Sequence, residues 1–331
     1  MLISRKNLLR IAKETALKSA LSDPGLVAAY LTGSVRSENP FLGNATDIDI
    51  VFVHAGEPQI RRGIIPLTPE IHLDIFHNPR SLYDKPKGLR VHPWLGPELY
   101  DPLPLYDPHH FFEFIQAGVR DRYDEPANVQ MRSHHLAENA RQAWNDLQPV
   151  HPHGPQQVLG YLKSISLAAN AIALLAGDPL AERRFLLQFP ARAQAAGQPG
   201  LADTLLSLLG ANRVEAATLA GFLPDWEKAF TEAAGIPAVN GRIALARLGY
   251  YKLAFESLLE SETPQASLWP LMLTWTLSVS VLPPMMAESW RSACGALGLD
   301  EASFDERMEE LDHFLDAIEA IQESLTDSQV F

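Results

Sequence analysis

The sequence predicts an α+β protein, with a small mixed sheet in its first third and an all-helical region after it. Short segments rich in β-branched residues and of alternating polarity occur between about residues 26 and 106. After about Pro126 the segments have apolar residues at helical spacing and no convincing strand. The 331 residues exceed the roughly 150 typical of one domain. We therefore expect a sheet domain over residues 1–126 and a helical domain over residues 127–331.

The first third alternates helix, turn and strand. A charged amphipathic helix is expected over residues 4–21, and it lacks the apolar core of a signal peptide. Asp23-Pro24-Gly25 then forms a turn. Strands are expected over residues 26–31, 47–53, 70–76 and 103–106, and a helix should begin near Pro108, where proline suits a first turn.

The remaining two thirds predict helices over residues 155–176, 202–209, 213–222 and 242–259. Ser303 and Glu306 form a capping box, followed by an apolar helical stripe from Met308 to Ile321. Residues 263–287 carry no charge, but recurrent Ser and Thr and the flanking prolines favour a buried helix over a membrane span.

Composition narrows the classes of function. The formal net charge of -13 disfavours a long nucleic-acid substrate, whose phosphates usually require a basic surface. The single cysteine, Cys294, excludes a disulfide framework within the chain and a thiolate zinc site. We expect a cytoplasmic protein without a membrane partner, and we leave a homodimer open.

Three carboxylates lie in the predicted strands. Alternation places Asp47 and Asp49 on one face of their strand, with Ile48 on the other. Asp74 lies between two apolar residues of the next predicted strand, so it faces away from them. Carboxylates gathered on one sheet face repel each other unless they share a cation. Partly hydrated Mg²⁺ completed by substrate phosphates is the natural partner, which predicts a metal site at Asp47, Asp49 and Asp74.

Gly33 and Ser34 follow the first predicted strand directly. Glycine there lets the backbone approach a phosphate closely, and the Ser34 hydroxyl and neighbouring N–H groups can donate to its oxygens. Arg36 is placed to add positive charge to the same anion. These three residues are therefore the candidate nucleotide-binding segment.

Together these features resemble a known signature. Gly33-Ser34, a spacer of twelve residues, Asp47-Ile48-Asp49 in an apolar strand, and a third strand with an acidic residue are similar to the DNA polymerase beta-like nucleotidyltransferase superfamily. The helical C-terminal region looks like the aminoglycoside and lincosamide nucleotidyltransferase branch. The resemblance covers about residues 26–76. It departs at Val35-Arg36-Ser37-Glu38, where many members carry a small residue plus Arg-Gly, and at Thr46, which is often Ser.

The resemblance implies roles for the site residues. Gly33 and Ser34 would hold the triphosphate, and Asp47 and Asp49 would bind Mg²⁺. Asp74 would be the third carboxylate, either a second-metal ligand or the general base. Lys163, on the first long helix of the helical domain, is a further candidate for phosphate binding, although an exposed helical lysine is the commoner interpretation.

The leading hypothesis is an enzyme that moves a nucleoside monophosphate, by default AMP from ATP, onto a hydroxyl of a small, antibiotic-like molecule and releases pyrophosphate. The acceptor would bind at the helical domain. Two alternatives stay open at this point. One is adenylylation of a protein partner, and the other is a catalytically silent nucleotide-binding protein.

Overall fold

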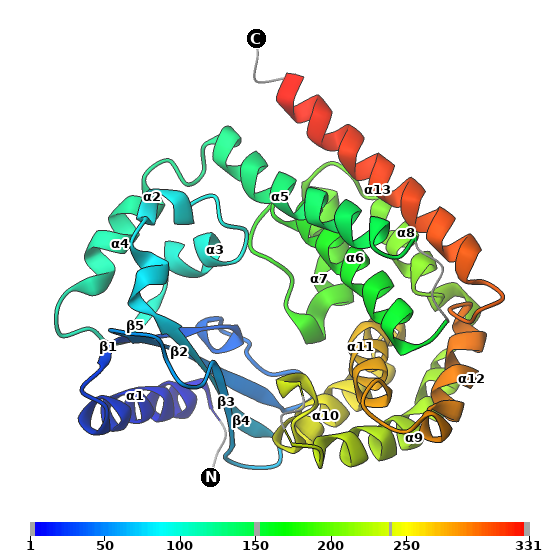
Figure 1. Cartoon of the computed structure of the whole chain (residues 1–331), viewed down its shortest axis with the longest axis horizontal. Coiled ribbons are helices and arrows are strands. Elements are labelled where there is room, and N and C mark those ends of the chain that lie inside the picture. Colours follow the sequence, from blue (N-terminus) through cyan, green and yellow to red (C-terminus); the bar gives the residue numbers. More distant parts are fainter. Residues whose placement is uncertain (1–3, 149–152, 238–239, 328–331) are drawn as a thin grey trace. The chain divides into compact units, whose positions relative to one another are not determined.

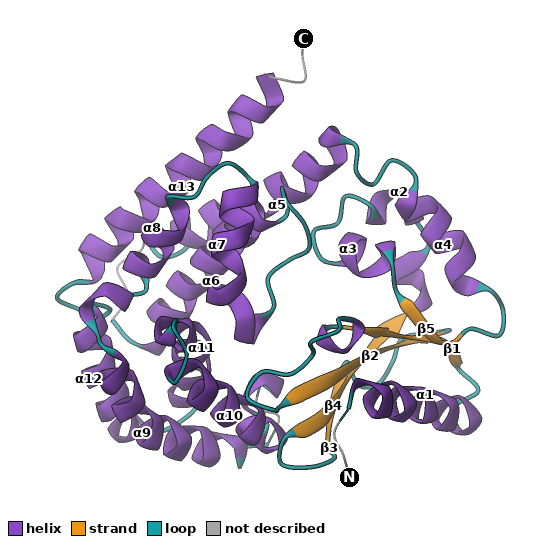
Figure 2. Cartoon of the chain, turned by 180° about the vertical axis from the view of Figure 1, so that it is seen from behind, coloured by secondary structure: helices purple, strands orange, loops and turns teal. Residues whose placement is uncertain are grey.

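The computed structural model describes residues 4–148, 153–237 and 240–327. The chain divides into two compact units, Met1–Asn128 and Val129–Phe331. Strands lie in the first unit, and the second is built from helices (Figure 2). The predicted α+β fold class is confirmed. No helix in the described ranges is both long enough and apolar enough to cross a membrane.

The first unit is organised around one five-stranded sheet. The strands are β1 Leu26–Thr32, β2 Thr46–His54, β3 Arg62–Pro66, β4 Ile71–Pro79 and β5 Leu103–Tyr106. Their spatial order is β3-β4-β2-β1-β5. The β2–β4 pair is parallel, and the other neighbours are antiparallel, so the sheet is mixed as expected.

Alternation in β2 separates two different environments. Ile48 and Ile50 join an apolar cluster with Leu8 and Ala12 of helix α1, Arg5–Ser22. On the opposite face, Val51 and other apolar side chains pack under α4, Phe111–Arg120, and its neighbours. Figure 1 shows α1 on one side of the sheet and α2 to α4 on the other. The carboxylates of β2 lie on the second face with Val51, nearer the start of the strand.

The predicted strands and the first helix are found within one to three residues of their expected ends. Two short helices, α2 Pro86–Leu89 and α3 Leu95–Tyr100, lie between β4 and β5. Strand β3 is an element that the sequence did not indicate. It is a five-residue antiparallel strand at the sheet edge with Gly63 and Pro66, residues that weaken the strand pattern.

The second unit consists of nine α-helices in the described ranges, apart from short 3-10 turns. They are α5 Pro126–Asn145, α6 Pro155–Ala173, α7 Phe185–Ala195, α8 Leu201–Leu208, α9 Ala216–Ala234, α10 Leu248–Leu259, α11 Leu268–Val279, α12 Glu288–Leu297 and α13 Phe304–Asp327. Helix α9 runs through Pro224 and past the expected end at Phe222, because Trp226 and Phe230 beyond it are buried. Helix α10 starts later than expected, after two 3-10 turns.

Helix α11 explains the uncharged segment. It is almost wholly buried, and the hydroxyls of Thr274, Thr276 and Ser278 donate to backbone carbonyls of the same helix. Thr274 and Thr276 accept hydrogen bonds from the indole N–H groups of Trp226, at 2.9 Å, and Trp290, at 3.0 Å. The segment is therefore a core helix of the second unit, as its Ser and Thr content predicted.

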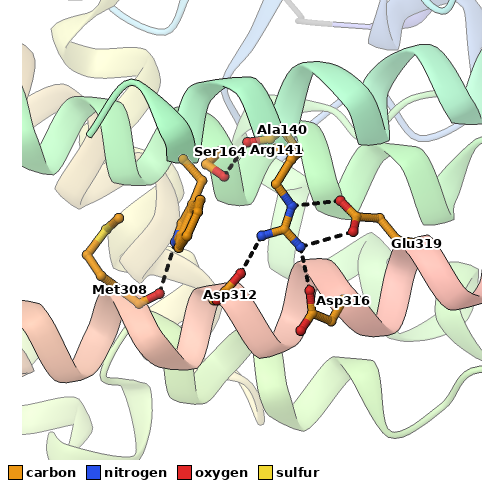
Figure 3. Close-up of polar contacts among 8 residues, drawn as sticks. Ala140, Arg141, Ser164, Met308, Asp312, Asp316 and Glu319 are labelled. Atoms are coloured by element: carbon orange, nitrogen blue, oxygen red, sulfur yellow. Dashed lines mark hydrogen bonds and ion pairs between the residues drawn. The ribbon is translucent and has the colours of Figure 1, made fainter. Parts of the chain in front are cut away.

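A charged contact joins α5 to α13 (Figure 3). The Arg141 guanidinium donates to Asp316 at 2.6 Å and to Glu319 at 2.7 and 3.1 Å, and it also pairs with Asp312. These carboxylates raise the pKa of Arg141, with the Glu319 hydrogen bond as the largest cause. One arginine thus ties the last helix to the first helix of this unit.

Candidate metal and nucleotide site

The site is built on two neighbouring parallel strands. In the β2–β4 register, Asp47 lies beside His72, and Asp49 lies beside Asp74. Residues paired in this way point to the same side of a sheet. Four polar side chains are therefore gathered on one face at one end of these two strands. Asp47 is 6% exposed, Asp74 is 1% exposed, and His72 is fully buried.

Three of these side chains converge closely enough to hold a metal ion. One ligand atom each from Asp47, His72 and Asp74 lies within 4.8 Å of the others. Among the residues that the structure describes, it is the only group of His, Cys, Asp or Glu side chains with this spacing. It contains two carboxylates and an imidazole, which are common metal ligands. The donor set therefore fits a divalent cation.

Sequence reasoning missed His72. The alternation in residues 70–76 that placed Asp74 also places His72 on the same face, two residues earlier. That signal was available, but only the β2–β4 register shows that His72 meets Asp47. Asp49, in contrast, is outside the 4.8 Å group, and its carboxylate lies against Gly33.

Gly33 packs directly on Asp49. Thr32 pairs with Asp49 across β1 and β2, so the turn after β1 passes over this carboxylate. Gly33 has φ 68° and ψ -160°, and a Cβ atom at this position would lie 1.8 Å from the Asp49 Oδ2 atom. Only glycine fits here, because any side chain would overlap Asp49 and strain the backbone. The predicted triphosphate-binding turn and one predicted metal ligand are therefore in contact.

Ser34 begins the short 3-10 helix η1, Ser34–Arg36. Its hydroxyl is 3.0 Å from that of Thr46, the residue before Asp47. Arg5 of α1, a residue that the sequence did not single out, donates to the backbone carbonyls of Val35 at 3.0 Å and Arg36 at 2.9 Å. These bonds fix the turn relative to both β2 and α1.

Arg36 lies near acidic side chains of α3 and the turn after it. Its guanidinium is 3.6 Å from the exposed carboxylate of Asp101, and its charge also acts on Glu98. The pair with Asp101 is long and solvated, so it holds Arg36 weakly. An incoming anion could compete for this guanidinium.

Asp74 carries a strong contact that the sequence did not indicate. Arg62 of β3 donates from Nε to one carboxylate oxygen at 2.8 Å and from Nη2 to the other at 2.5 Å. The same guanidinium lies 4.8 Å from the centre of the Phe76 ring. This bidentate geometry is the strongest form of an arginine–carboxylate pair.

The charges of the site nearly match one divalent cation. The three carboxylates of Asp47, Asp49 and Asp74 carry three negative charges, and the Arg62 guanidinium carries one positive charge. The remaining two negative charges are balanced by one divalent cation.

A second buried polar group lies further along the same face. Tyr30 of β1 donates to Glu98, its hydroxyl is 3.2 Å from that of Tyr83, and Asn78 donates to Tyr83 at 2.9 Å. Burial raises the pKa of the Glu98 carboxyl and raises the pKa of Tyr83 to about 12. Glu98 therefore holds a proton more firmly than an exposed glutamate does.

Lys163 belongs to the second unit. It lies in α6 with an exposed side chain, between the buried residues Leu162 and Ser164. Its role in phosphate binding stays a prediction.

No family model and no curated protein matches this chain. Among solved structures, the chain is similar to a nucleotidyltransferase-like protein from Exiguobacterium sibiricum 255-15, with 10% sequence identity and a TM-score of 0.29, over 92% of this chain and 89% of that chain. A similarity at this TM-score carries no argument about fold or chemistry.

Proposed function

We propose that this protein is a metal-dependent nucleotidyltransferase that moves a nucleoside monophosphate from a triphosphate, by default ATP, onto a hydroxyl of a small molecule. The observation that carries the proposal is the packing of Gly33 on Asp49 beside the Asp47, His72 and Asp74 group. The turn at Gly33, which has no room for a side chain, lies beside an acid group that can bind a cation. Transfer of a phosphate-bearing group requires a phosphate-binding segment and a cation side by side.

Each residue has a definite task in this proposal. Gly33 leaves the backbone open for close approach of the triphosphate, and Ser34 and Arg36 offer donors to its oxygens. Asp47 and Asp49 would hold the cation together with Asp74 of β4. A bound divalent cation would supply positive charge to the phosphate oxygens and to the departing pyrophosphate. The acceptor oxygen forms a bond to the α-phosphorus as the bond to pyrophosphate breaks.

Asp74 is the proposed third carboxylate, and its ion pair with Arg62 limits whether it can act as a general base. A general base must have an oxygen free for the proton of the acceptor hydroxyl, whereas Arg62 binds both Asp74 oxygens. Either the guanidinium gives up one of these bonds during the reaction, or Asp74 acts only as a metal ligand. The second case leaves the proton to solvent or to the acceptor's own groups.

The same ion pair favours a second candidate function, a protein that binds nucleotide without transferring it. Such a protein keeps Asp47, Asp49 and Gly33 for binding but has no available base. The two functions separate cleanly, because both require metal-dependent nucleotide binding and only the enzyme releases pyrophosphate. The helical unit, residues 127–331 by our sequence analysis, is proposed to bind the acceptor in the first case.

The test starts with calorimetric titration of Mg²⁺ and a non-hydrolysable ATP analogue into wild type and the Asp47→Asn, Asp49→Asn double variant. We expect metal-dependent binding in wild type and its loss in the double variant. Glu14→Gln is the matched control, because Glu14 is exposed on α1, which covers the other face of the sheet. Wild type that binds no nucleoside triphosphate would refute both functions.

If binding is found, pyrophosphate release is measured with a panel of hydroxyl-bearing acceptors, including cationic amino sugars. Mass gain of one nucleoside monophosphate on the acceptor would support the enzyme. Mass gain on a protein would instead indicate a protein acceptor, and binding without release would favour the silent protein.

A further inference from the structure

We propose that His72 is a direct nitrogen ligand in this site, so that the site prefers a first-row transition-metal ion to Mg²⁺. This inference deepens the proposed function, because it concerns the same cation site. It adds an imidazole to the carboxylates proposed above, with Asp47, His72 and Asp74 as the converging group.

The ligand atoms of Asp47, His72 and Asp74 lie within 4.8 Å of one another. Ligands about 2.1 Å from a six-coordinate ion lie ~3.0 Å apart when adjacent and ~4.2 Å apart when opposite. A contraction of up to about 1.8 Å between adjacent ligand atoms therefore closes the group around an ion, a distance that side-chain rotation can supply. The register fixes the backbone positions, since His72 pairs with Asp47 and lies two residues from Asp74 on β4.

The donor atoms of this group also favour particular metal ions. Mg²⁺ prefers oxygen ligands and keeps several waters, whereas imidazole suits Fe²⁺, Ni²⁺, Cu²⁺ and Zn²⁺. His72 is fully buried, so its imidazole is shielded from bulk water and faces two carboxylates. A mixed nitrogen and oxygen set gains affinity along the transition-metal series, which Mg²⁺ cannot match.

Arg62 binds both oxygens of the Asp74 carboxylate, at 2.8 and 2.5 Å. Metal-binding carboxylates are commonly held by an outer hydrogen-bond partner that fixes their orientation. Arg62 fits that role and lowers the net charge of the acid group to the value that a single ion balances.

The decisive measurement is pulsed electron paramagnetic resonance on wild type loaded with less than one equivalent of Mn²⁺, without nucleotide. The protein carries ¹⁵N only in its histidines, and the buffer contains no imidazole. We expect a ¹⁵N coupling of the size produced by a directly bound imidazole. This measurement needs no variant, so it stands even if substitutions at the buried His72 disturb folding.

Variants then assign the signal. His72→Gln should remove the ¹⁵N coupling and weaken Mn²⁺ binding by at least the roughly tenfold loss that changes around metal ligands cause. Binding of Mg²⁺ should fall by a smaller factor. His77→Gln is the matched control, because His77 lies on the same strand but pairs with His54, away from the acid group. It should keep the coupling.

The outcomes separate this inference from the proposed function. Mn²⁺ bound without a histidine coupling, and lost in Asp47→Asn, would overturn the nitrogen ligand while leaving the metal site intact. A coupling that survives in His72→Gln would also overturn it. Failure of wild type to bind either Mn²⁺ or Mg²⁺ in the presence of nucleotide would overturn the proposed function as well.

Discussion

Gly33→Ala tests the contact on which the candidate site depends. The perturbation adds one methyl group at a backbone position with φ 68° and ψ -160°, a region that is essentially restricted to glycine. Holding alanine there costs about 1–3 kcal/mol. The new Cβ atom would also lie 1.8 Å from Asp49 Oδ2 and 2.7 Å from its Cγ. Real carbon and oxygen atoms do not approach so closely, so Asp49 must move away from the turn.

The expected result has two parts. The free energy of unfolding of the sheet unit should fall by at least the backbone cost, about 1–3 kcal/mol, which corresponds to a fall in Tm of roughly 4–12 °C for a unit of this size. Divalent-cation and nucleotide binding should weaken as well, because the Asp49 carboxylate is displaced. Scanning calorimetry and cation titration measure the two effects.

Gly63→Ala is the matched control for this change. Gly63 lies in β3 of the same sheet, and a Cβ atom there would meet nothing within 4 Å. In an Asp49→Ala background, Gly33→Ala should cost less, because the Oδ2 and Cγ atoms are gone and only the Asp49 Cβ remains, at 3.1 Å. The reasoning is refuted if Gly33→Ala is as mild as Gly63→Ala, or if its cost is the same in both backgrounds.

Three further predictions concern other charged contacts. Arg62→Gln should destabilise the metal-free protein by about 1–3 kcal/mol, because the buried Asp74 loses its counter-charge, and it should weaken cation binding, because Asp74 loses the partner that fixes its orientation; equal stabilisation of variant and wild type by Mn²⁺ in thermal melts would contradict this. Glu98→Gln should flatten the pH dependence of stability, because the folded-state pKa of Glu98 lies above the ordinary 4.5, so its contribution is present below pH 4.5 and is lost as pH rises through the raised pKa. Urea titrations of both proteins from pH 4 to 8 should show wild type losing stability relative to the variant. Arg141→Met should destabilise the helical unit by about 1–2 kcal/mol, because the three acidic side chains that now bind Arg141 would then repel one another. Arg10→Met, at an exposed pair on α1, should change stability by no more than about 0.5 kcal/mol, and equal effects of the two changes would refute the role of Arg141.

An imidazole ligand at His72 would change which cation the assays need. If the site holds an imidazole ligand, an assay supplied only with Mg²⁺ would underestimate binding and turnover. Cation choice should therefore be varied before the silent alternative is accepted. The Arg62 variant is informative here as well, because it changes the charge of the acid group without removing a ligand.

The sequence by itself determined the features that depend on neighbouring residues. Alternation in β2 put Asp47 and Asp49 on one face and Ile48 on the other, because successive side chains of a strand point to opposite sides. Helical periodicity likewise located α6 and α13, and the Ser and Thr content of α11 identified it as a core helix. Only the choice of candidate residues, and not their distances, followed from these patterns.

The tertiary structure decided which of these residues meet. The parallel pairing of β2 with β4 sets His72 beside Asp47 across 25 positions of sequence, and β3 brings Arg62 to Asp74 from the sheet edge. Such pairings depend on long-range hydrogen bonding and burial, which leave no periodic trace in the segments themselves. The same holds for Gly33. Its sequence neighbours indicate a turn, but its positive φ and the Asp49 carboxylate packed against it, which together require glycine, are known only from the tertiary structure.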